Sequence, residues 1–140
     1  MQQTLGKGQD SGKLFMEKEL TPLKKVLSKL KTEGKILLAI LFGSYAQGVP
    51  HKRSDIDLAV YINTEDENER FLITDEILMS IERDVNILRL DDEEESPFVV
   101  QAALKGMHLV EPDVEALYNV ARRALHETEG IRFRRSLVER

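Results

Sequence analysis

Cysteine is absent from the 140-residue sequence, which excludes a disulfide framework and a metal site built on thiolates. Long apolar runs are missing too, since no stretch approaches the roughly 20 residues that a membrane-spanning helix needs. Residues 1–13 contain no apolar segment of the kind that signal peptides carry, so we expect a flexible lead-in there rather than a targeting signal. Together these absences favour a cytoplasmic protein.

An excess of positive charge is also lacking. The formal net charge is −5 and the sequence pI is about 5.3, which argues against a protein whose main task is to grip a nucleic acid backbone. An acidic run at residues 91–95 and a basic segment at 132–140 are expected to be solvated surface. The content of 41% hydrophobic and 32% charged residues is typical of a globular protein, and the length predicts one domain over residues 14–140 that ends in a helix.

Hydrophobic periodicity predicts strands that alternate with helices. Strands are expected at residues 36–42, 55–62, 84–90 and 107–111. Start and stop signals predict helices from Thr21-Pro22 to Gly34, after a capping box at Thr64 and Glu67, from Ser96-Pro97 to Gly106, and from Pro112-Asp113 to Gly130. The inward residues of the second helix are expected to be Phe71, Leu72, Leu78 and Ile81. The pattern predicts an α/β fold with a small mixed β-sheet and helices packed mainly on one face.

Two aspartates interrupt the predicted second strand. Side chains alternate along a strand, so Asp55 and Asp57 point to one face while Ile56 and Leu58 point to the other. Leaving either carboxylate unpaired in an apolar place costs several kcal/mol. The two carboxylates also repel each other. A divalent cation would relieve both the repulsion and the lack of a partner, and Mg²⁺ typically takes one or two carboxylates plus substrate phosphates. The pair therefore predicts a metal–phosphate site.

Gly43 and Ser44 end the preceding strand and complement that site. A glycine at a strand end lets the backbone approach a ligand closely, and free N–H groups after Ser44 would face a phosphate. A lone Asp-x-Asp or Gly-Ser more often marks a strand end or a capped turn. Here both occur in the order strand, Gly-Ser, loop and strand with carboxylates, and this context favours the functional interpretation.

The spacing Gly-Ser-x10-Asp-x-Asp resembles the signature of the DNA polymerase beta-like nucleotidyltransferases, and GSYAQGVPHKRSDIDLAV is similar to their minimal prokaryotic branch. The resemblance extends over about residues 20–125, including KGMHLVEPD. It implies the polymerase beta-like nucleotidyltransferase fold, with Gly43 and Ser44 binding phosphate and Asp55 and Asp57 binding metal. The family's third carboxylate lies at the start of the next core strand, where Asp84 is the match.

Asp91 and Asp92 are rivals for that third position, although they lie at the far end of the same predicted strand. This chain also has Gln47 where relatives often carry arginine, which weakens the expected charge pairing with a triphosphate. Lys52 and Arg53 are candidates to compensate.

The resemblance implies a Mg²⁺-dependent nucleotidyltransferase that uses two metal ions and ATP. In this branch such proteins are often antitoxins that adenylylate a tyrosine of a HEPN-domain toxin, so the expected partners are such a toxin and ATP, without a membrane or direct nucleic acid contact. An enzyme acting on a small acceptor is one alternative, although only about 30 residues follow Pro112, too few for an acceptor domain. A non-catalytic module that masks its toxin is the other.

Overall fold

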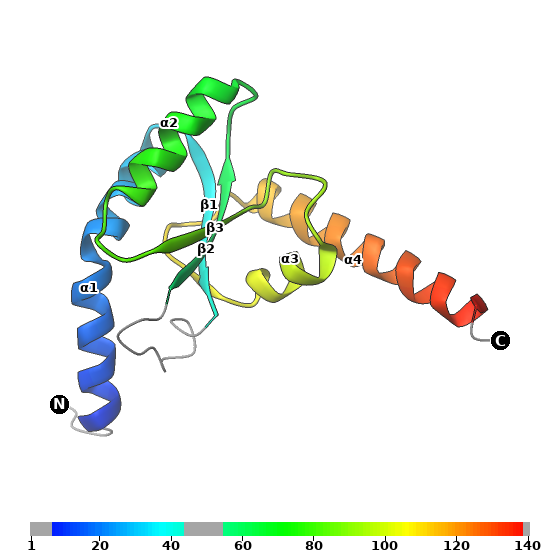
Figure 1. Ribbon diagram of the computed structural model, residues 1–140, viewed down its shortest axis with the longest axis horizontal. Helices are drawn as coiled ribbons and strands as arrows, with labels where there is room; N and C mark the ends of the chain where they lie inside the picture. Colours follow the sequence, from blue (N-terminus) through cyan, green and yellow to red (C-terminus); the bar gives the residue numbers. More distant parts are fainter. Residues whose placement is uncertain (1–6, 44–54, 139–140) are drawn as a thin grey trace.

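A computed structural model of the protein describes the backbone of residues 7–43 and 55–138, and the side chains of residues 18–43 and 55–128 (Figure 1). Four strands form one sheet in the order β3-β2-β1-β4. Their bounds are Ile36–Phe42 for β1, Ile56–Ile62 for β2, Val85–Arg89 for β3 and Met107–His108 for β4. β1 is antiparallel to both β2 and β4, whereas β2 and β3 are parallel. The mixed α/β class is therefore confirmed.

The helices are divided between the two faces of the sheet. α1 (Lys7–Thr32) and α2 (Glu67–Leu78) cover one face, and α3 (Pro97–Leu104) and α4 (Val114–Val138) cover the other (Figure 1). The expectation that helices pack mainly on one face is wrong. The reason lies in the central strands, because ILLAILF in β1 is apolar at successive positions and needs cover on both sides.

Each face has its own hydrophobic core. Under α1 and α2 the buried side chains include Leu23, Leu27, Ile56, Leu58, Ile73 and Ile77. Under α3 and α4 they include Leu38, Ile40, Ala59, Leu88, Val100 and Val120. None of the described helices is both long enough and apolar enough to cross a membrane.

The first and last helices are longer than predicted. α1 begins at Lys7, so residues 7–13 are helical where a flexible lead-in was expected, and Pro22 lies inside the helix instead of starting it. The apolar stripe that packs on the sheet already includes Leu20, one turn before this proline. At the other end α4 continues through Gly130 to Val138. A glycine inside a helix costs only about 0.5–1 kcal/mol, which does not stop a long one.

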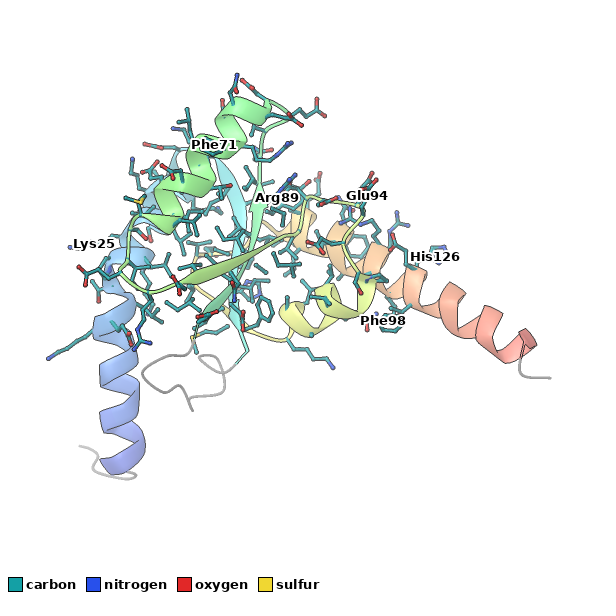
Figure 2. The ribbon with its side chains drawn as sticks, viewed as in Figure 1. Lys25, Phe71, Arg89, Glu94, Phe98 and His126 are labelled. Atoms are coloured by element: carbon teal, nitrogen blue, oxygen red, sulfur yellow. The ribbon has the colours of Figure 1, made fainter. Side chains whose placement is uncertain are left out.

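The predicted orientation of α2 is also wrong in part. Phe71 and Leu72 are 68% and 65% exposed, and Leu78 is exposed as well, whereas Ile73 and Ile77 face the core. Phe71 lies on the outer side of the helix (Figure 2). Ile81, just after the helix, packs partly against the core as expected. The predicted residues include neighbours such as 71 and 72, which cannot share one narrow helical stripe, whereas positions 73 and 77 can.

Caps and edges differ by smaller amounts. The N-cap of α2 is Asp66, whose side chain accepts from the backbone N–H of Asn68, while the Thr64 hydroxyl accepts from the N–H of Asp66. β4 has two residues rather than five, although the N–H of Leu109 still donates to Ala39 of β1. α3 begins at Pro97 after Ser96, as predicted.

Candidate functional site

The two predicted metal-binding carboxylates lie where β1 ends and β2 begins, at the lower side of the sheet in Figure 1. Asp57 is paired with Phe42, the last residue of β1. Its neighbours Ile56 and Leu58 are fully buried under α1 and α2. Alternation therefore directs Asp57 to the face that α3 and α4 cover, where it is half-buried at the rim.

Asn86 of β3 joins Asp55 and Asp57. Its Nδ2 lies 3.3 Å from Asp55 Oδ2 and 3.3 Å from Asp57 Oδ1, close enough to donate a hydrogen bond to each. The prediction that both carboxylates share one face is confirmed, because a single nitrogen reaches both. The register brings Asn86 there, since it is the parallel partner of Asp57.

The sequence analysis missed Asn86. A signal was present, because Asp84-Val85-Asn86 repeats the polar–apolar–polar alternation of Asp55-Ile56-Asp57 at the start of a strand. Because the side chain of Asn86 is an uncharged amide, it does not stand out among the carboxylates that predict a metal site.

Gly43 fits against Asp57 in a way that admits no side chain. Its φ of 75° lies in the left-handed region that favours glycine. A Cβ at this position would collide with Asp57 Oδ2 and would lie 3.2 Å from Asp57 Cγ. The glycine therefore lets the carboxylate rest against the end of β1.

The segment that follows Gly43, residues 44–54, lies outside the described residues. It contains Ser44, the second predicted phosphate-binding residue, together with Gln47, Lys52 and Arg53. Their predicted roles stay predictions.

Asp84 lies just before β3 and is exposed. Its backbone carbonyl accepts from the N–H of Ile56 at 2.9 Å, so its main chain is tied to the start of β2. Within the described part of the chain, no group of three or more carboxylate or histidine side chains is placed to hold a metal ion. The expected three-carboxylate cluster is thus not assembled, and the metal-binding role of Asp84 stays a prediction.

The rival carboxylates lie at the opposite end of β3. Asp91 accepts from the N–H of Ile62 at 3.1 Å and from Arg89 at 2.7 Å, and Arg70 Nε lies 3.9 Å away. The hydrogen bond that Arg89 donates to Asp91 raises the pKa of the Arg89 guanidinium above its ordinary value. Asp92 accepts from the backbone N–H of Glu94. Asp91 therefore stabilises the fold and lies away from Asp55 and Asp57.

The donor set at the start of β2 suits a hard divalent cation. It comprises the carboxylates of Asp55 and Asp57, whose oxygens are the ligands that Mg²⁺ and Ca²⁺ prefer, and Asn86 Nδ2 faces both of them. Among the side chains that the structure describes, neither aspartate forms an ion pair. Two adjacent carboxylates that form no ion pair with a described side chain attract an external cation strongly, because its charge relieves their mutual repulsion.

Known proteins resemble this chain in sequence and in fold. The family model described as polymerase beta, nucleotidyltransferase matches residues 24–115. The chain belongs to this family. The matched range includes Gly43, Asp55, Asp57 and Asp84, and Asn86 falls within it too.

One relative and two solved structures are informative. The protein adenylyltransferase MntA of Shewanella oneidensis is 39% identical over 57 residues, a match that covers 40% of this chain and 41% of the relative. A toxin–antitoxin structure with AMP-PNP has a TM-score of 0.62 at 24% identity, covering 82% of this chain and 94% of the other. An MntA–HepT toxin–antitoxin structure has a TM-score of 0.57 at 20% identity, covering 84% and 93%. These likenesses confirm the predicted nucleotidyltransferase fold.

Proposed function

We propose that this protein transfers AMP from ATP to a tyrosine hydroxyl of a HEPN-domain toxin and thereby acts as its antitoxin. The observation that carries the proposal is the pair Asp55 and Asp57, which share one face of β2 in a family of nucleotidyltransferases and lack an internal cation among the described residues. The similarity to an adenylyltransferase and to toxin–antitoxin structures supports AMP as the group and a toxin as the acceptor.

The reaction forms one bond and breaks another at the α-phosphorus of ATP. The tyrosine oxygen attacks, the bond to the β-phosphate oxygen breaks, pyrophosphate leaves and the hydroxyl proton passes to solvent or a base. Bound Mg²⁺ would supply charge neutralisation on the phosphates and a lower pKa for the attacking hydroxyl. Asp55 and Asp57 would hold this metal, with Asp84 as the proposed third ligand. Catalysis then rests mainly on positioning and electrostatic stabilisation.

Gly43 and Ser44 are proposed to receive the phosphates. Gly43 supports this role because its missing side chain lets the backbone at the end of β1 lie directly against the Asp57 carboxylate. The phosphate chain would then run between the end of β1 and the carboxylates of β2.

The exposed side of α3 and α4 is the proposed toxin-binding surface. Phe98, which is labelled on α3 in Figure 2, is 41% exposed, and Tyr118 and Leu125 of α4 are 64% and 54% exposed. These helices cover the sheet face to which Asp57 and Asn86 belong. A toxin bound there would lie on the catalytic side of the sheet, and its surface would also exclude water from the reacting groups. Exposed aromatic residues are the type that anchors protein interfaces.

The cellular setting follows from the same proposal. We place the protein in the cytoplasm with its toxin and ATP, and we expect no direct binding to nucleic acid because the net charge is −5.

Mass spectrometry of the toxin tests the proposed reaction. A HEPN-domain toxin is incubated with this protein, ATP and Mg²⁺, and a gain of about 329 Da per AMP is expected. Asp57→Asn serves as the inactive control. A toxin that stays unmodified yet inhibited favours the masking module, and a toxin neither modified nor bound favours a small acceptor.

A further inference from the structure

Asn86 makes the contact that holds the two site carboxylates together. Its Nδ2 is 3.3 Å from Asp55 Oδ2 and 3.3 Å from Asp57 Oδ1. An amide nitrogen carries two hydrogens, so one group can donate to both carboxylates at once. Both distances lie just beyond the usual range of roughly 2.7–3.2 Å, and such bonds are readily exchanged for stronger contacts.

The position of Asn86 is set by the sheet. It is the partner of Asp57 in the parallel ladder between β2 and β3, and the N–H of Ile56 ties the two strands together at the carbonyl of Asp84. The amide therefore reaches the carboxylates from a paired strand, and its placement persists without a ligand.

The amide is also the compensation that the described chain offers to this negative charge. Neither Asp55 nor Asp57 forms an ion pair with a described lysine, arginine or histidine. Two parallel carboxylates repel each other, and the positive ends of two N–H bonds offset part of that repulsion. A divalent cation would do the same with full charge.

We propose that Asn86 is a positioning residue that takes the place of the divalent cation in the metal-free protein and gives up both hydrogen bonds when the cation binds. This inference rests on the proposed metal-binding role of Asp55 and Asp57. Because its amide is neutral, Asn86 adds no negative charge to the two carboxylates.

Loss of the Asn86 amide is expected to strengthen cation binding. An interaction present only in the free protein stabilises that state and therefore weakens cation binding. Removing the amide must destabilise the metal-free protein and tighten its affinity for the cation. A carboxylate at position 86 must do both more strongly, because it replaces a donor with a further negative charge.

Mn²⁺ alone, without nucleotide or toxin, is the probe. Isothermal titration calorimetry gives its Kd, and thermal unfolding with and without saturating Mn²⁺ gives the stability of each form. We expect Asn86→Ala to lower the midpoint of the metal-free protein, to match the wild type once Mn²⁺ saturates it, and to tighten the Kd by about three- to tenfold. Asn86→Asp should tighten it by at least about tenfold. Asn119→Ala, at an exposed asparagine of α4, is the matched control and should leave the Kd unchanged.

The outcomes separate this inference from the proposed function. A wild-type protein that binds Mn²⁺ through Asp57, combined with an Asn86→Ala variant of unchanged or weaker affinity, overturns the inference alone. A wild-type protein whose Mn²⁺ binding is absent, or is unaffected by Asp57→Asn, overturns the metal site and this inference together. If Asn86→Ala does not fold, the affinity of Asn86→Asp decides, and a Kd no tighter than wild type contradicts the proposal.

Discussion

Carboxylates at the two ends of the β2–β3 pair differ in their charged partners. At the end where β3 stops, Asp91 is surrounded by the guanidinium of Arg89 at 2.7 Å, that of Arg70 and the N–H of Ile62. At the end where β2 starts, Asp55 and Asp57 share only the neutral amide of Asn86 among their described hydrogen-bonding partners.

The difference separates a carboxylate that is paired within the fold from two that form no ion pair with a described side chain. Asp91 has its cations built into the chain, and its side chain is only 9% exposed, so its charge is already used to close the sheet. Asp55 and Asp57 lie at the rim without an ion pair to a described side chain, which is the arrangement that the proposed metal site requires.

The largest effect is expected from Asp57→Asn. The change keeps the shape of the side chain but removes one charge from the proposed metal site, so AMP transfer should fall by at least about a hundredfold. Folding should survive, because the substitution also relieves repulsion with Asp55. A radiolabelled ATP transfer assay measures the rate, and circular dichroism checks the fold.

Full transfer activity in Asp57→Asn would show that the start of β2 is not the catalytic end of the β2–β3 pair. Asp84→Asn in the same assay decides whether Asp84 belongs with this end, and wild-type activity there would remove it from the site.

Asp91→Ala should produce the converse result, with a loss of stability. It leaves the guanidinium of Arg89 and the N–H of Ile62 without their acceptor and removes the ion-pair partner of Arg70, which costs about 2–3 kcal/mol of unfolding free energy. Urea denaturation measures this loss. Transfer per folded molecule should stay near that of the wild type, and a variant that is stable but inactive would contradict the division between the two ends.

Gly43→Ala tests how closely the end of β1 is fitted to the site. The left-handed backbone costs an alanine about 1–2 kcal/mol, and the added Cβ must displace the carboxylate of Asp57. Transfer should therefore fall along with stability, measured by the same assays.

Gly34→Ala is the matched control because φ there is 74° and an added Cβ meets nothing within 4 Å. It should show the backbone cost without the loss of transfer. Equal activities in the two variants would mean that the contact between Gly43 and Asp57 is unimportant.

Asp92→Ala should have the smallest effect. Asp92 neighbours Asp91, but the hydrogen bond described for its side chain is a local one from the N–H of Glu94. We expect a change within about 0.5 kcal/mol in urea denaturation. A cost equal to that of Asp91→Ala would show that stability at this end depends on general negative charge instead of the specific pairing of Asp91.

The central strands and the shared face of the two aspartates were predictable from sequence. β1 matches its predicted bounds, and β2 differs by one residue, because continuous apolar runs and strict alternation are strong local signals. Asp55 and Asp57 follow from the same alternation. The contact of Asn86 with the two aspartates could not be predicted from sequence. It depends on which residue of β3 lies opposite Asp57, and that register is set by the tertiary structure.

The helix boundaries show where local signals fail. Pro22 predicts a helix start and Gly130 a helix end, but both lie inside long helices. Around Pro22 the apolar stripe already includes Leu20, so packing against the sheet outweighs the local start signal. The distribution of helices over both faces likewise depends on chain connections, which periodicity alone does not specify.

A crystal structure of the protein with Mg²⁺ and a non-hydrolysable ATP analogue tests the central claim most directly. The account predicts metal density within bonding distance of the carboxylates of Asp55 and Asp57, with the phosphates beside Gly43, while Asp91 keeps its contacts with Arg89. Nucleotide and metal bound away from the start of β2, with Asp55 and Asp57 still joined only by Asn86, would contradict it.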